Sequence, residues 1–161
     1  MAAVDFYLKI DGIPGESKDS KHANEIDVES WSWGASQTGT MGHGGGGGAG
    51  KVSMQDFMFT MKVNKATPKL ILACASGAHI PSATLTVRKA GGKQEEFLKY
   101  KFTDVLISSY HTGGSSEAAV PTDAVSLNYT KIEVAYAEQK KDGGLEGAIT
   151  ANWSVKENKG G

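Results

Sequence analysis

Hydrophobic and polar residues alternate with a period of two through much of the chain, which is typical of strands with one buried face. The first such stretch places Val4, Phe6, Leu8 and Ile10 on one face and ends in the turn-forming residues of 11–17. Further stretches cover residues 26–33, 51–63, 84–88, 95–110, 125–136 and 145–155. The pattern therefore predicts about eight strands.

The alternation slips by one residue inside some of these stretches. Ile26 and Val28 share one parity and Trp31 and Trp33 share the other, which predicts a β-bulge near residues 29–30. A similar slip occurs within 51–63. In the last stretch the apolar residues share one face, namely Leu145, Ile149, Ala151, Trp153 and Val155.

One helix interrupts the strands. Thr67 is a suitable N-cap, Pro68 suits the first helical position, and Gly77 is placed to end the helix. The helix is short and mostly apolar, so we expect it to cover one end or flank of the β-structure. The sequence thus predicts one all-β domain over residues 1–161, a barrel or sandwich with one helix, a Gly-rich loop at 39–50 and a frayed polar tail at 156–161.

Charge and composition narrow the possible partners. The 161 residues include 17 basic and 18 acidic ones, a net charge of −1, and Arg88 is the sole arginine. Nucleic acid is therefore an unexpected partner, because phosphate binding needs clustered cations. No apolar run reaches the length of a membrane span, and the first residues lack the pattern of a cleavable signal. We expect a chain made in the cytoplasm, without disulfides because Cys74 is the only cysteine.

The glycine run resembles a phosphate-binding loop only superficially. Gly45, Gly50 and Lys51 have the spacing G-x-x-x-x-G-K, but Val52 stands where Ser or Thr would bind magnesium. A strand rather than a helix follows, so the helix N-terminus that such loops need is missing. We interpret the run as an extended loop and not as a nucleotide site.

Other catalytic and metal-binding patterns are also missing from the sequence. His22, His43, His79 and His111 show no ligand spacing and are interpreted as solvated loop residues. Cys74 lies in an apolar run, where a free cysteine usually acts as a small buried hydrophobe. We therefore expect no enzyme activity, no cofactor and no metal. The competing hypothesis is a nucleotide-dependent enzyme that uses the glycine loop, and it requires that the protein bind a nucleotide.

The tryptophans raise one further possibility. Trp31, Trp33 and Trp153 could stack on sugar rings, as in a carbohydrate-binding or extracellular-matrix-binding β-sandwich module. Their parity instead matches the core faces of their strands, which favours packing. The carbohydrate-binding module stays as the alternative function, and its tryptophans should then be exposed.

Several long segments together resemble the haemolysin-coregulated protein (Hcp) family, whose members are tube subunits of bacterial type VI secretion systems. The segments are residues 8–17 (LKIDGIPGES), 22–34 (HANEIDVESWSWG), 44–52 (GGGGGAGKV), 66–92, 112–115 and 127–129. They occur in order over nearly the whole chain. Residues 117–123 and those after 142 are the least similar part.

The resemblance implies a compact β-barrel of two sheets flanked by an α-helix, assembling into a hexameric ring. Rings stack into a tube that a contractile sheath expels, with a spike protein at its tip and effector proteins in its lumen. The chain's partners would be other copies of itself, the spike, the sheath and effectors, and it would be secreted without a cleavable signal peptide. A six-fold ring joins two different patches of neighbouring subunits.

The glycine loop is the candidate assembly contact. It has almost no apolar side chains to bury in its own subunit, and its glycines carry a large ordering entropy. A long loop of this kind is usually functional or disordered. A disordered connector is the alternative interpretation. The candidate assembly residues are Gly42, His43, Gly44, Gly45, Gly46, Gly47 and Gly48.

Overall fold

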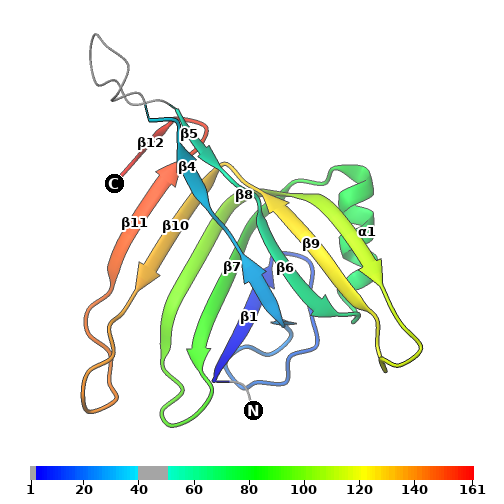
Figure 1. Cartoon of the computed structure of the whole chain (residues 1–161), viewed down its shortest axis with the longest axis horizontal. Coiled ribbons are helices and arrows are strands. Elements are labelled where there is room, and N and C mark those ends of the chain that lie inside the picture. The colour runs from blue at the N-terminus through cyan, green and yellow to red at the C-terminus, as the bar shows by residue number, and fades with distance from the viewer. Residues whose placement is uncertain (1–2, 40–50) are drawn as a thin grey trace.

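The computed structural model describes residues 3–39 and 51–161 of the chain. Within them the chain forms twelve strands and one helix (Figure 1). In order they are β1 (Val4–Ile10), β2 (Ile26–Val28), β3 (Ser30–Ser32), β4 (Ala35–Gln37), β5 (Val52–Met54), β6 (Phe57–Lys62), α1 (Thr67–Ser76), β7 (Ile80–Lys89), β8 (Glu96–Gly113), β9 (Thr122–Asn128), β10 (Lys131–Tyr136), β11 (Ile149–Ser154) and β12 (Lys159–Gly160). Residues 40–50 of the predicted glycine loop 39–50, which include all of its candidate assembly residues, lie outside the described residues.

The strands close into a barrel. β1 pairs with β2 and β7, β7 pairs with β8, β8 pairs with β9, and β9 pairs with β6. β6 then pairs with β3, which follows β2 after the single residue Glu29. Every pairing is antiparallel, and the circuit is complete. The expected two-sheet barrel with one helix is confirmed.

The barrel closes because two strands bend from one sheet into the other. At Glu29 the alternation slips, as predicted, and its N–H donates to Thr60 O at 2.8 Å. β8 bends at Asp104, which has a φ of 53°. This left-handed conformation is uncommon for a residue with a side chain, and Asp tolerates it better than most. Up to Val105, β8 pairs with β7 and β10, and from Leu106 onward it pairs with β9.

The core fills the space between the two sheets. Its largest fully buried side chains come from both sheets and from α1 and are Leu8, Ile26, Phe57, Phe59, Met61, Leu70, Leu85, Phe102, Val105, Ile107, Val125 and Leu127. Burial of apolar surface contributes about 25 cal/mol per Å², so these side chains stabilise the fold by being removed from water.

The helix ends where Gly77 was predicted to end it, with a φ of 65° and its N–H bonded to Cys74 O at 3.4 Å. Its predicted N-cap was wrong. Ala66 takes that position without a side-chain hydrogen bond, because the Asn64 side chain accepts from Ala66 N at 2.7 Å and forms the turn itself. The Thr67 hydroxyl instead donates to Asp123 at 2.7 Å.

Two predictions near the C-terminus were also wrong. The stretch 125–136 is two strands, β9 and β10, which lie in different sheets and meet at Tyr129 and Thr130. The tail is not frayed, because β12 pairs with β11 and Asn152 N donates to Gly161 O at 2.9 Å. A Cβ on Gly160 would lie 2.0 Å from Asn152 O, so this close pairing requires glycine.

Candidate functional site: surfaces for assembly

Strands β10, β11 and β12 extend one sheet beyond the closed barrel (Figure 1). We call them the wing. One face of the wing continues the face of the sheet that lines the barrel core. On it, β10 and β11 form three cross-strand pairs, Ile132 with Trp153, Val134 with Ala151, and Tyr136 with Ile149.

Burial falls steadily along this face of the wing. Ile132 is 3% exposed, whereas Tyr136 is 45% and Ile149 is 73% exposed. The same apolar stripe therefore begins inside the barrel core and ends in solvent. An exposed apolar patch continuous with a core is a typical protein–protein interaction surface.

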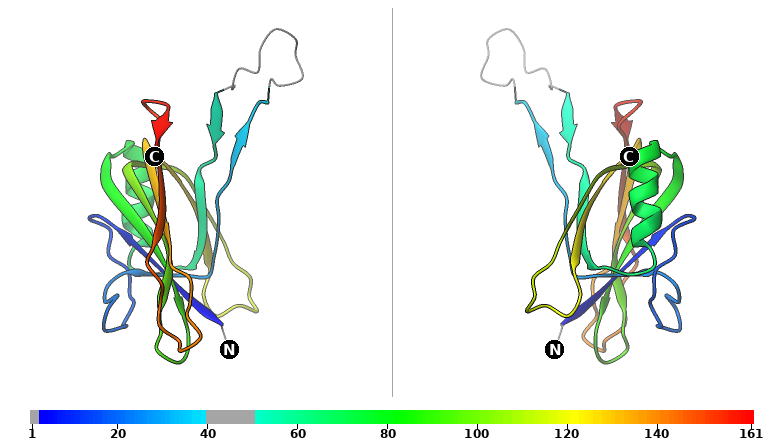
Figure 2. Two further views of the ribbon diagram at one scale, coloured as in Figure 1. Left: turned by 90° about the vertical axis from the view of Figure 1, so that its left-hand side faces the viewer. Right: turned by 90° about the vertical axis from the view of Figure 1, so that its right-hand side faces the viewer.

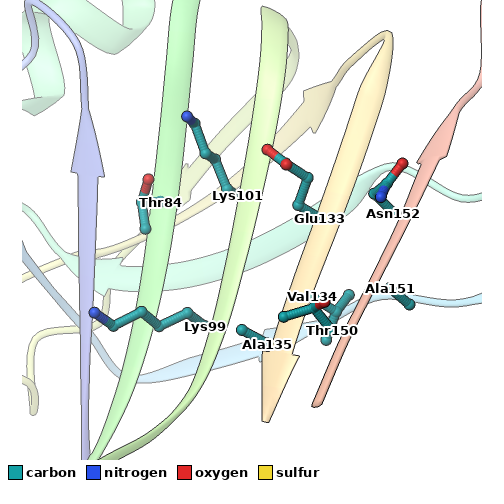
Figure 3. Close-up of a pocket in the computed structure, with 9 residues that line it drawn as sticks. All are labelled: Thr84, Lys99, Lys101, Glu133, Val134, Ala135, Thr150, Ala151 and Asn152. Carbon is teal, nitrogen blue, oxygen red and sulfur yellow. The ribbon is translucent and has the colours of Figure 1, made fainter. Parts of the chain in front are cut away.

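The opposite face of the same sheet is polar. Thr84, Lys101, Glu133 and Asn152 form one row across β7, β8, β10 and β11. Figure 3 shows them rising from adjacent strands together with Lys99 of the next row, around an open hollow of about 400 Å³. The Glu133 carboxylate also lies 4.0 Å from the Lys131 ammonium. These groups form a charged, solvated face rather than an enclosed reaction site.

A two-stranded ribbon projects from the barrel on the side away from α1 (Figure 2). It consists of β4 and β5, paired from Ala35 with Met54 to Gln37 with Val52. We call this ribbon the arm. The glycine run 40–50 connects its two strands in the sequence, so the arm carries the predicted assembly loop.

The three tryptophans lie against the core and are partly buried. Trp31 packs between Phe57 and Tyr100, with ring centroids 6.1 and 5.2 Å away. The Trp33 indole N–H donates to the Tyr129 hydroxyl. The tryptophans therefore do not form the open stacking platform that the carbohydrate-binding alternative needs.

The histidines do not all match their predicted setting. His79 is exposed and 3.2 Å from Asp104, and His111 is an exposed strand residue. His22 is buried, contrary to prediction. Its ring stacks on Tyr7 and lies 2.9 Å from Glu25 and 3.1 Å from Glu96. Sequence separation hid this arrangement, because Glu96 is 74 positions away.

Arg88 also has a role that the sequence did not reveal. Its side chain is 3% exposed, and its guanidinium contacts Asp19, Asp5 and Tyr7. The hydrogen bonds that Arg88 donates to Asp19 and Asp5 raise the pKa of Arg88 further above its ordinary value, against the effect of burial. The contacts of Arg88 and His22 together fix the long loop 11–25 to the outside of the barrel.

In residues 3–39 and 51–161, no group of three or more His, Cys, Asp or Glu side chains is arranged to hold a metal ion. Cys74 is partly buried in α1. In the same part of the chain, no helix combines the length and apolar character of a membrane span.

Known proteins are similar to this chain in sequence and in fold. The family model described as "Type VI secretion system effector, Hcp" matches residues 7–136. Protein hcp1 of Pseudomonas aeruginosa is 50% identical over 158 residues, which cover 97% of this chain and 98% of that protein.

Solved structures agree with this match. A type six secretion system protein superposes with a TM-score of 0.93 at 33% identity, covering 99% of this chain and 100% of the other. Hcp1 from Salmonella typhimurium gives a TM-score of 0.80 at 38% identity, covering 99% of both chains.

The barrel fold and these matches place the chain in the class of type VI secretion system β-barrel proteins. The chain belongs to the Hcp family of type VI secretion systems. Members of this family form hexameric rings and tubes, and the chain is a structural subunit of such a tube. The family is structural and secreted, and the carbohydrate-binding alternative is not favoured.

Proposed function

We propose that six copies of the chain close into a ring through the wing and that rings stack through the glycine segment 39–50 on the arm. The observation that carries the first part is the apolar stripe ending at Tyr136 and Ile149. A neighbouring subunit that covers this stripe extends the core across the subunit boundary. At about 25 cal/mol per Å², covering Ile149 alone contributes on the order of 2 kcal/mol per contact.

The neighbour supplies a different patch, because a ring interface is heterologous. Ile71 and Leu72 of α1 are 46% and 67% exposed. Helix α1 lies on the other side of the molecule from the wing (Figure 1), which is the position that a ring-forming partner patch needs. The wing of one copy then packs against α1 of the next.

The experiment that tests the ring interface uses two substitutions on β11. Ile149→Asp puts a charge into the apolar stripe and should convert hexamers to monomers. Thr150→Asp is the matched control, because Thr150 pairs with Ala135 on the opposite face and borders the hollow with Lys99. A hexameric Ile149→Asp protein would show that the wing is not the interface.

The stacking role is tested by replacing Gly42–Gly48 with an Asn-Gly turn. The glycine segment can approach another subunit closely through its backbone, since it has few side chains to exclude one. The shortened protein should keep the circular dichroism and hexamer mass of the wild type but form no tubes. If the shortened protein formed normal tubes, the segment would be only a connector. If the shortened protein did not fold, the segment would be part of the barrel.

The remaining proposals follow from family membership. The chain has no enzyme activity, and its stacked rings contact a spike protein, a contractile sheath and effector proteins. It is made in the bacterial cytoplasm and reaches the exterior without a cleavable signal peptide. Secretion of an unprocessed N-terminus, measured by mass spectrometry of culture supernatant, tests the last point.

A further inference from the structure

Tyr129 lies where the chain leaves β9 for β10 and crosses between the two sheets. It is 5% exposed. Its hydroxyl donates to Gln55 O at 2.7 Å and accepts from the Trp33 indole N–H. Trp33 comes just before the arm's first strand and Gln55 just after its second, separated from β4 and β5 by at most one residue. One buried hydroxyl therefore bridges both roots of the arm.

The two roots are also joined to each other. Gln55 N donates to Gly34 O at 2.9 Å. A Cβ on Gly34 would lie 3.0 Å from Gln55 Oε1, so the Gln55 side chain lies close over the Gly34 backbone. The next residue, Asp56, accepts from Ser108 Oγ at 2.6 Å and from Asn128 Nδ2 at 2.9 Å, which holds the second root to β8 and β9.

The bridging groups are anchored in the barrel, whereas the arm is not. The Tyr129 ring lies 4.9 Å from Phe102, a fully buried core residue, and Trp33 lies 6.1 Å from Tyr100. All three residues of β4 are exposed. A two-stranded ribbon alone is at best marginally stable in water and cannot fix its own direction.

We propose that Tyr129 is the positioning residue of the arm, whose hydroxyl ties Trp33 and Gln55 to the barrel and so sets the direction in which the arm leaves the subunit. The inference rests on the proposed function in one respect, since a defined direction matters for stacking only if the arm contacts the next ring. The tie itself is a property of the single subunit.

The test compares two variants that each lose one hydroxyl. Tyr129→Phe removes the bridge and keeps the ring in the core. Tyr110→Phe is the control, because its hydroxyl also donates a 2.7 Å hydrogen bond, to Asp123, and borders α1 rather than the arm. The readouts are hydrogen exchange of peptides covering residues 34–39 and 51–56, hexamer mass, and tube length by electron microscopy.

We expect Tyr129→Phe to speed hydrogen exchange in those two peptides about tenfold, because the net contribution of a hydrogen bond changes a local opening equilibrium by up to about that factor. The ring should stay hexameric. Tubes should shorten or disappear. Tyr110→Phe should leave arm exchange and tubes unchanged, even if it lowers the melting temperature equally.

Two results would overturn the proposal. Unchanged arm exchange in Tyr129→Phe would show that the hydroxyl does not hold the arm. Faster exchange with tubes of normal length would show that the held direction has no role in stacking. Normal tubes from the protein shortened at Gly42–Gly48 would instead refute the stacking role of the glycine segment. Hydrogen exchange in the arm peptides of Tyr129→Phe would still decide whether Tyr129 holds the two roots of the arm.

Discussion

Arg88 donates hydrogen bonds to both oxygens of the Asp19 carboxylate, with Nη1 2.9 Å from Oδ2 and Nη2 2.9 Å from Oδ1. The two residues are 69 positions apart, one on β7 and one in the loop 11–25. This bidentate geometry is the strongest form of the Arg–carboxylate pair and fixes orientation as well as distance. The pair fastens the loop to the barrel.

The first prediction concerns acid. The hydrogen bond from Arg88 holds the pKa of Asp19 at about 2, below its ordinary value of 3.8. The unfolded chain then binds this proton more readily than the folded one between about pH 4 and 2, so stability falls as the pH drops through that window. Asp19→Asn should lower the melting temperature by several degrees at neutral pH.

This deficit of Asp19→Asn should shrink toward zero near pH 2, where the wild type has lost the same contribution. Calorimetric scans of both proteins across the acid range measure it. A difference in melting temperature that is constant with pH would mean that the Arg88–Asp19 pair does not contribute as described.

The second prediction concerns Asp123, which joins α1 to the sheets. Asp123 is fully buried and accepts from Thr67 and Tyr110, both at 2.7 Å. Burial and the hydrogen bond to Asp123 raise the pKa of Tyr110. Asp123→Ala leaves two hydroxyls without their acceptor and should cost about 3 kcal/mol.

Urea unfolding at one fixed protein concentration tests this value, since assembly also affects apparent stability. Tyr110→Phe loses one of the two bonds and should cost about 1 kcal/mol. Equal losses in the two variants would argue that Asp123 does not join α1 to the sheets.

The third prediction concerns the tail. Gly160 leaves no room for a side chain, because a Cβ would lie 2.0 Å from Asn152 O and 2.9 Å from the Trp153 ring. Gly160→Ala should release β12 from β11 and expose Trp153. Amide exchange at residues 152–154 should speed up, whereas Gly161→Ala, which has open space around it, should not change it. Similar exchange in both variants would mean that β12 does not depend on this close contact.

The fourth prediction concerns the partner patch on α1. Leu72 is 67% exposed, so Leu72→Asp should fold with an unchanged circular dichroism spectrum. If α1 packs against the wing of the next copy, the variant should dissociate at protein concentrations where the wild type stays assembled. Lys69→Asp, at another exposed position of α1, distinguishes loss of apolar contact from a change in charge. A stable Leu72→Asp hexamer would place the partner patch elsewhere.

Local sequence signals predicted much of this fold. The slip at Glu29 marked the bend between β2 and β3, and Gly77 marked the end of α1. A comparable slip separates Val125 and Leu127 from Ile132 and Val134, and it could have revealed that β9 and β10 are different strands. The helix N-cap was missed because the preceding Asn64 forms the turn that Thr67 was expected to cap.

The assembly surfaces could not be predicted in the same way. Alternation identifies Ile149 as part of an apolar face, but it does not say whether anything covers that face. Arg88 was visible as the sole arginine, yet its acidic partners lie 69 and 83 positions away. Such contacts depend on the closed barrel, which a local pattern does not specify. The residues that support the arm, Trp33, Gln55 and Tyr129, are likewise brought together only by the fold.

The mass of the native oligomer tests the central claim most directly. Native mass spectrometry of the purified chain, without added ligand or metal, should give a species of about 100 kDa, six times the 16.9 kDa of one subunit. Ile149→Asp should give the mass of a single chain under the same conditions. A wild-type protein that is monomeric at micromolar concentration would contradict the account.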